Sequence, residues 1–306
     1  MRDEADMPVD TPDRLSDAVA AGHSARGSAG GPCFSCGQCP VQSVGVCRRV
    51  GRRDIGRLLP RGARGSLRKA GSPLFRQGEP FDHILIVQSG WAQIHKLFED
   101  GRRQILRFAL PGDLIGFEGS EGTGMAYGAD AITDMSVCAI KRSVFYRVCA
   151  DSPALAMNFA SMATREALAA WNHVGALGQQ AALGRVANLL LDLHRRITSC
   201  PDGWQVGRQD EGGHGEGGQG EGGSGVVLHL PLSQLHIADA TGLTPVHVCR
   251  TLKRMKTEGL LEFRKGDLVL LDPGRLARIA QLDPDIGAPA AWLPLRSGSG
   301  SSARRS

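Results

Sequence analysis

The segment 230–258 constrains the fold most, because it holds the start and stop signals of two short helices joined by one glycine. Ser233 is placed to cap the first helix, and Gly242 supplies the turn. Thr244 is placed to cap the second helix, whose first position is Pro245, a residue favoured there. This order of signals predicts a helix-turn-helix.

The second of these helices has an apolar side and a basic side. Val248, Leu252 and Met255 recur at i, i+4 and i+7 and are expected to face the core. The cap and the outward side chains are the candidate DNA contacts: Thr244, His247, Arg250, Lys253 and Arg254. Arg250 is the candidate for a bidentate contact with guanine, and the others are expected to contact bases or phosphates.

A hairpin is predicted directly after the second helix. Gly259 can end that helix, and residues 260–263, 264–267 and 268–271 have the pattern of strand, turn and strand. The alternative is a generic helical hairpin, but the caps, the turn, the basic face and the trailing strands agree with one another. The segment is therefore predicted to be a winged helix-turn-helix that binds DNA.

A β-rich module is predicted between residues 71 and 145. Short apolar runs occur at 84–87, 91–94, 105–108, 114–117 and 137–140. Gly, Pro and Asp separate these runs at hairpin spacing, which predicts a small barrel or roll of antiparallel strands.

A long amphipathic helix is predicted for residues 153–177, followed by a second at 183–196. Arg165 and Glu166 are the only charged residues between 154 and 178, so much of the first helix is expected to be buried. That burial is consistent with a dimer interface or with an ordinary core helix, and the periodicity favours neither.

These elements predict an α+β fold with the following organisation. The expected parts are a disordered tail at 1–31, a cysteine-rich segment with a sensory module at 32–150, a long helix at 151–180, a DNA-binding domain at 181–283 with a glycine-rich insertion at 202–225, and a largely disordered tail at 284–306. No apolar stretch is long enough for a membrane span and no signal pattern opens the chain, so a cytoplasmic location without membrane contact is expected.

Half of the eight cysteines lie within residues 33–47, which is too dense for a core-packing role. Cys36, Cys39 and Cys47 have the spacing C-x2-C-x7-C and can surround one soft metal centre if a fourth ligand comes from elsewhere. Alternatively, Cys33 completes a four-thiolate zinc site with the other three. In a reducing compartment, such a group of cysteines favours metal binding or redox chemistry over disulfide bonds.

Several motifs, in order along the chain, resemble the Crp/Fnr transcription regulators. They include GWAQIH at 90–95, GRRQILRFALPGDLIGF at 101–117 and LTPVHVCRTLKRMKTEGLL at 243–261. The resemblance spans about residues 33–283. It implies a cyclic-nucleotide-binding-type β-roll, a dimerisation helix and a C-terminal winged helix-turn-helix. It also implies a homodimer that binds palindromic double-stranded DNA and contacts RNA polymerase, and no enzymatic activity.

Within that family, the cysteines resemble those of the oxygen-sensing fumarate-nitrate-reduction subgroup. The run Cys36-Gly-Gln-Cys39 through Cys47 is similar to the alphaproteobacterial form of its N-terminal motif, and residues 134–140 resemble the strand that donates a fourth thiolate. The resemblance therefore implies a [4Fe-4S] cluster held by Cys36, Cys39, Cys47 and Cys138. Cys33 is an extra thiol, so the alternative is a regulator with a zinc site, or with no metal and a different effector. A less favoured alternative is a redox protein that carries the cluster.

Two departures from the family pattern bear on what the protein recognises. Cyclic-nucleotide binders use an arginine in the roll to contact the phosphate, but no Lys or Arg lies between Arg107 and Lys141, so no cyclic nucleotide is expected. In the second helix of the DNA-binding motif, Val246 and Cys249 occupy positions where the oxygen sensors usually have Glu and Ser. Because Arg250 is retained, DNA binding is still expected, but the resemblance does not extend to that subgroup's usual half-site.

Overall fold

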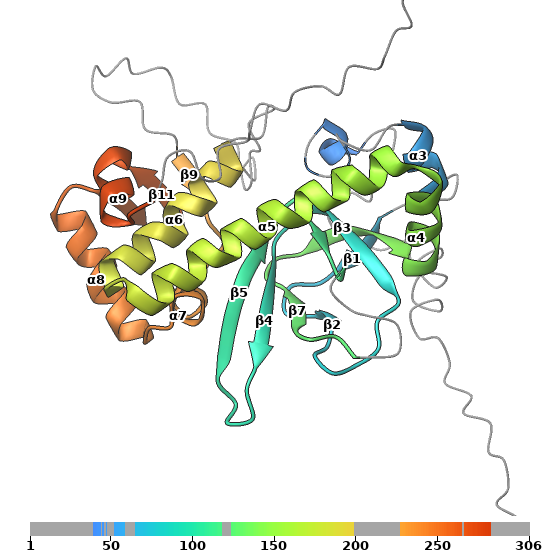
Figure 1. Ribbon diagram of the computed structural model, residues 1–306. Coiled ribbons are helices and arrows are strands. Elements are labelled where there is room, and N and C mark those ends of the chain that lie inside the picture. Colours follow the sequence, from blue (N-terminus) through green and yellow to red (C-terminus); the bar gives the residue numbers. More distant parts are fainter. Residues whose placement is uncertain are drawn as a thin grey trace, which may run out of the picture. The chain divides into compact units, whose positions relative to one another are not determined.

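The structure is a computed structural model that describes residues 39–43, 45, 47, 52–58, 65–117, 124–198, 227–264 and 266–282 (Figure 1). The chain divides into two compact units, residues 1–156 and 157–306. The predicted tails, 1–31 and 284–306, and the insertion 202–225 lie outside the described residues.

Within its described residues, the first unit contains two antiparallel sheets of four strands each. The first sheet has the order β1 (Ser66–Arg68), β8 (Met135–Lys141), β3 (His83–Ser89) and β6 (Leu114–Ile115). The second has the order β2 (Pro73–Phe75), β7 (Gly128–Ala131), β4 (Ala92–Leu97) and β5 (Arg103–Ala109). The predicted antiparallel roll is confirmed.

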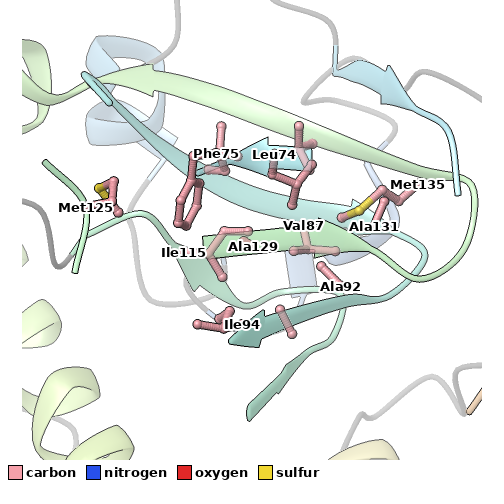
Figure 2. Close-up of a cluster of buried hydrophobic side chains, with 13 residues drawn as sticks. Leu74, Phe75, Val87, Ala92, Ile94, Ile115, Met125, Ala129, Ala131 and Met135 are labelled. Carbon is pink, nitrogen blue, oxygen red and sulfur yellow. The ribbon is translucent and has the colours of Figure 1, made fainter. Parts of the chain in front are cut away.

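Apolar side chains from both sheets form the core of this roll (Figure 2). Val87 and Val137 of the first sheet and Ala92 and Ala129 of the second are fully buried. Successive side chains of a strand point to opposite faces, so the neighbours Ile86 and Cys138 lie on the outer face of the first sheet. Burial of the apolar side chains between the sheets supplies the main stabilising term of this unit.

Helix α4 (Arg142–Asp151) follows β8 and begins with a buried arginine. The guanidinium of Arg142 donates to the carbonyls of Gly116 at 2.6 Å, Phe117 at 3.0 Å and Phe81 at 3.3 Å. These bonds offset the cost of burying the charge and tie α4 to two loops of the roll. Ahead of the roll, the N-terminal segment forms the short helix η2 (Pro40–Ser43) and helix α3 (Arg52–Leu58).

Helix α5 (Pro153–Gln179) continues from the first unit into the second and is followed by α6 (Ala182–Thr198). The remaining elements are β9 (Val227–His229), α7 (Gln234–Thr241), α8 (Pro245–Thr257), β10 (Leu261–Arg264), β11 (Asp267–Leu270) and α9 (Pro273–Ile279). The strands form a sheet of order β10-β11-β9. Since α7 and α8 form the helix pair and β10-β11 the hairpin, the predicted winged helix-turn-helix is confirmed.

The junction of α5 and α6 is fixed to the DNA-binding elements by side chains. Gln180 Nε2 donates to the Ala280 carbonyl at 2.6 Å, and Arg185 donates to the carbonyls of Gln180 at 2.8 Å and Thr241 at 3.4 Å. Burial lowers the pKa of His173 in α5, whose ring also shares a hydrogen bond with the backbone of Ala240. The C-terminal part of α5 therefore packs with α7 and α9 as one unit.

The long elements match the sequence-based expectations within a few residues, and several of the short ones were missed. The helices predicted at 153–177 and 183–196 run from Pro153 to Gln179 and from Ala182 to Thr198. Strands β1, β2, β7 and β9 and helices α4 and α9 were not predicted; each strand has three or four residues, too few for a clear alternation.

Candidate nucleic-acid interface and thiol site

Helix α8 begins at a well-formed cap after a tight turn. Gly242 has the left-handed φ of 64° and donates its N–H to the Ala238 carbonyl, which ends α7. Thr244 Oγ1 then accepts the backbone N–H of His247 at 3.2 Å, and Pro245 follows as the first residue of α8. The turn and the cap fix the direction in which α8 leaves the domain core.

The buried side of α8 comprises Val248, Thr251, Leu252 and Met255. All five predicted DNA contacts, Thr244, His247, Arg250, Lys253 and Arg254, are exposed. At about 100° per residue, Arg250 and Lys253 lie opposite the buried side, while His247 and Arg254 lie on one flank. The exposed face of α8 is therefore basic, as a major-groove helix requires.

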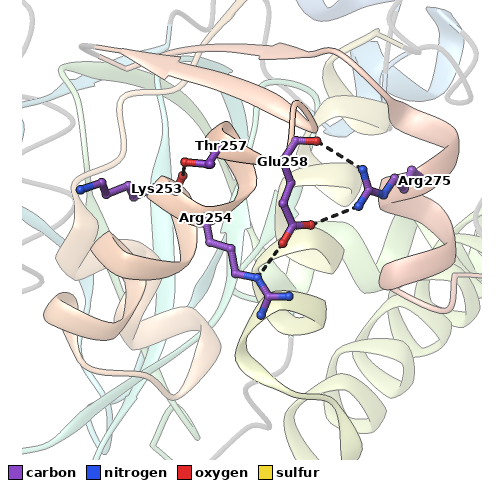
Figure 3. Close-up of polar contacts among 5 residues, drawn as sticks. All are labelled: Lys253, Arg254, Thr257, Glu258 and Arg275. Atoms are coloured by element: carbon purple, nitrogen blue, oxygen red, sulfur yellow. Dashed lines mark hydrogen bonds and ion pairs between the residues drawn. The ribbon is translucent and has the colours of Figure 1, made fainter.

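Arg254 is held within the protein by an ion-pair network (Figure 3). Its Nε donates to Glu258 Oε1 at 2.7 Å, and Arg275 at the start of α9 donates to Glu258 Oε2 and to the Glu258 carbonyl, both at 3.3 Å. Arg250 has no side-chain ion pair or hydrogen bond among the described residues. Of the two arginines, Arg250 is thus the one available to a base, and Arg254 is oriented by Glu258.

The thiol-bearing segment lies against the first sheet of the roll. Gln88 in β3 is fully buried, and its Nε2 donates to Cys39 Sγ at 3.7 Å. Gln88 lies at a register shift of β3, next to Ser89, whose partner Ser136 is two residues from Cys138 in β8. The structure therefore brings Cys39 to the part of the first sheet where β3 pairs with β8. Strand β8 carries Cys138, which is 8% exposed and is the one cysteine in the described strands of the two sheets.

The absence of a side chain at Gly65 leaves room for the side chain of Gln88. A Cβ at residue 65 would lie 1.7 Å from Gln88 Oε1, a distance that excludes any side chain there unless Gln88 moves. Burial raises the pKa of the Cys39 thiol, which keeps it protonated near neutral pH in the absence of a metal. Gln88, unlike the cysteines, carries no sequence signal, because its role depends on which strand faces the N-terminal segment.

Of the remaining predicted metal ligands, the structure describes only Cys47. Cys47 is partly buried, whereas Cys33 and Cys36 lie outside the described residues. Among the residues that are described, no three His, Cys, Asp or Glu side chains converge as a metal site. The donor set nevertheless fits a thiolate-bound centre in one respect, since both thiols are soft ligands and Cys39 contacts the sheet that carries Cys138.

Helix α3 links the segment after Cys47 to the start of α5. Arg57 forms an ion pair with Asp151, and Ser152 Oγ donates to Asp54 Oδ2 at 3.2 Å. Burial, with a smaller effect of Asp54, raises the pKa of Cys149 at the same contact. The junction between α4 and α5 is thereby connected to the cysteine-bearing segment.

Arg107 and Arg142, the nearest arginines before and after the loop between β6 and β7, both bind groups of the protein itself. Arg107 donates to the Leu114 carbonyl at 2.8 Å and lies 3.7 Å from Asp113, while Arg142 is buried against the carbonyls described above. Residues 118–123 of this loop are outside the described part of the chain. Neither flanking arginine is placed to receive a phosphate.

A β-roll followed by a long helix and a winged helix-turn-helix defines a two-domain transcription regulator. The cyclic nucleotide-binding domain family matches residues 68–152, and the Crp-like helix-turn-helix domain family matches residues 184–279. The chain belongs to the Crp/Fnr family of transcription regulators, which are DNA-binding proteins and not enzymes. None of its described helices has the length and apolarity that a membrane span requires.

Individual relatives agree with this assignment. The transcriptional activatory protein AadR of Rhodopseudomonas palustris is 30% identical over 79% of this chain and 91% of its own. The transcriptional activator protein FnrL of Cereibacter sphaeroides is 28% identical over 83% and 95%. The solved structure of FixK2 from Bradyrhizobium japonicum, 29% identical, covers 72% of this chain and 98% of its own with a TM-score of 0.59.

Proposed function

We propose that this regulator responds to oxygen through a [4Fe-4S] cluster held by Cys36, Cys39, Cys47 and Cys138. The contact of Gln88 with Cys39 carries the proposal, because it brings Cys39 to the sheet that carries Cys138, where β3 pairs with β8. When bound, such a cluster supplies a centre that oxygen destroys, as thiolate-held iron-sulfur centres are prone to oxidation. Similarity to FnrL over 83% of the chain is consistent with this subgroup.

Helix α3 offers the route from this site to the dimer interface. Its contacts Arg57–Asp151 and Asp54–Ser152 lie next to Pro153, where α5 begins. A change in the segment that carries Cys47 alters the position of α3, and hence the start of α5. We infer that oxygen controls DNA binding by changing how two copies of α5 pack.

The competing proposal is a regulator with structural zinc bound by Cys33, Cys36, Cys39 and Cys47, with another effector or none. The density of thiols within residues 33–47 favours it, because these four residues need no ligand from the roll. Anaerobic purification separates the two proposals. A brown protein that contains iron and sulfide supports the cluster, and a colourless protein with stoichiometric zinc excludes it.

Replacing Gln88 by Leu is expected to speed the loss of visible absorption in air several-fold. An N–H donor to a cluster sulfur raises the reduction potential, so loss of the donor makes oxidation easier. The matched control is Gln93→Leu, since Gln93 is 4% exposed and donates to Asp130 in the second sheet. Equal half-lives for Gln88→Leu and wild type, with equal anaerobic iron content, would show that Gln88 does not act on the cluster.

We propose that α5 forms a homodimer interface. Met157, Leu168 and Trp171 follow one another at i, i+11 and i+14, so they lie on one side of the helix, with exposed fractions of 65%, 39% and 67% in the single chain. Large apolar side chains in such a row indicate a buried partner. A dimer places two copies of α8 about 34 Å apart, which requires a palindromic operator.

The double substitution Leu168→Asp, Trp171→Asp is expected to convert an anaerobic dimer to a monomer and to reduce operator binding to the level of random DNA. Two carboxylates in each copy would have to be desolvated at the interface. Light scattering after size exclusion gives the mass directly. Leu97→Asp is the control, because Leu97 is 51% exposed at the end of β4; a dimer that survives the double substitution would exclude this side of α5 as the interface.

AadR and FnrL are described as transcriptional activators, and activation requires contact with RNA polymerase. We therefore propose RNA polymerase as a second partner and the cytoplasm, where the DNA lies, as the location. A cyclic nucleotide is not proposed as effector, because Arg107 and Arg142 are both engaged by backbone carbonyls.

A further inference from the structure

An apolar side chain stands on the DNA-facing side of α8. Val246 is 61% exposed in the first turn of the helix and precedes Arg250 by four residues, so the two side chains are neighbours on one face. The buried side of α8, formed by Val248, Thr251 and Leu252, lies opposite. Val246 therefore contributes nothing to the domain core.

Val246 differs in its chemistry from the polar side chains of Thr244 and His247 at the start of α8. Thr244 Oγ1 accepts the His247 N–H, and Pro245 has no N–H of its own. A branched apolar side chain neither donates nor accepts a hydrogen bond. Val246 thus adds an apolar contact beside Arg250, next to the polar contacts that His247 and Thr244 can make.

We propose that Val246 contacts the 5-methyl group of a thymine, close to the guanine that Arg250 recognises. In the major groove thymine alone presents a methyl group, and apolar side chains pack against it. Four residues of helix rise about 6 Å, so the thymine lies within about two base pairs of the guanine. The proposal rests on DNA binding through α8 and is independent of the thiol site.

The preferred operator is obtained first, by selection from random double-stranded DNA with the full-length protein purified without air. We expect two inverted half-sites, each with a thymine on either strand within about two base pairs of a guanine. A half-site without such a thymine would refute the role of Val246 and leave DNA binding intact. Failure to select any sequence would refute sequence-specific binding as a whole, and this proposal with it.

Removal of the methyl group alone gives the decisive test. Replacing that thymine by deoxyuridine in both half-sites is expected to weaken wild-type binding about 15-fold, or about fourfold for each lost methyl contact. Val246→Ala is expected to bind the thymine operator with a similar loss and to be insensitive to deoxyuridine. Val246→Ile, which keeps a branched apolar side chain, should restore the sensitivity.

Val227→Ala is the control, because Val227 is 63% exposed but belongs to β9. It should keep wild-type affinity and wild-type sensitivity to deoxyuridine. Affinity of Val246→Ala for random DNA reports whether the variant is folded, since that affinity depends on basic residues that are unchanged. Equal binding of both operators by wild type, or a deoxyuridine penalty that persists in Val246→Ala, would overturn the proposal.

Discussion

Arg250→Ala should weaken operator binding by at least about 30-fold at fixed salt, the largest effect of any single substitution in α8. A bidentate arginine–guanine contact contributes about 1–3 kcal/mol, and a dimer has one in each half-site. Arg250 is exposed on the side of α8 opposite Val248 and Met255. Unlike Arg254, which Glu258 holds at 2.7 Å, it has no competing carboxylate among the described residues.

Fluorescence anisotropy with operator and with random DNA, at one salt concentration, measures the effect. Arg278→Ala is the control, since Arg278 is exposed in the last turn of α9 and carries the same charge. We expect Arg250→Ala to lose the preference for operator over random DNA, and the control to retain it. An equal loss on both DNAs would instead identify Arg250 as a phosphate contact.

Cys138→Ala should abolish the iron content of the anaerobic protein, from about four irons per chain to a trace. Cys138 supplies the proposed fourth ligand from β8, and Cys39 is hydrogen-bonded to the same sheet through Gln88. An incomplete thiolate set leaves one iron without a protein ligand, which makes the cluster labile. The visible absorption and the sulfide content should disappear together.

Cys149→Ala is the matched control for this substitution. Cys149 is another thiol of the first unit, partly buried, but it lies in α4 beside Asp54 rather than on the sheet. Its loss should leave iron and colour unchanged. Full iron content in Cys138→Ala, or loss in Cys149→Ala alone, would show that the remote ligand has been assigned to the wrong cysteine.

Much of the fold follows from signals that act over a few residues. The helix-turn-helix was predicted from Ser233, Gly242, Thr244 and Pro245, and each has the predicted local role in the structure. The longer strands were predicted because their apolar runs and turns are local as well. The four-residue strands β10 and β11 were predicted too, because a turn joins them, whereas β1 pairs with the distant β8 and no local pattern marks it.

The functional residues divide in the same way. The outward position of Arg250 was predicted from the spacing of the apolar residues in its helix, and the structure places it on the exposed face. Gln88, Arg142 and Glu258 were missed, since each acts on a residue or backbone group brought near by tertiary structure. Val246 was noted as a departure from the family pattern and was not among the predicted contacts.

Operator binding by the wild-type protein before and after exposure to air, with iron measured on the same samples, tests cluster control of DNA binding most directly. We expect the anaerobic protein to bind tightly with about four irons per chain, and operator affinity and iron to fall together in air. Equal affinity of the two samples, or tight binding by a colourless zinc protein, would contradict cluster control.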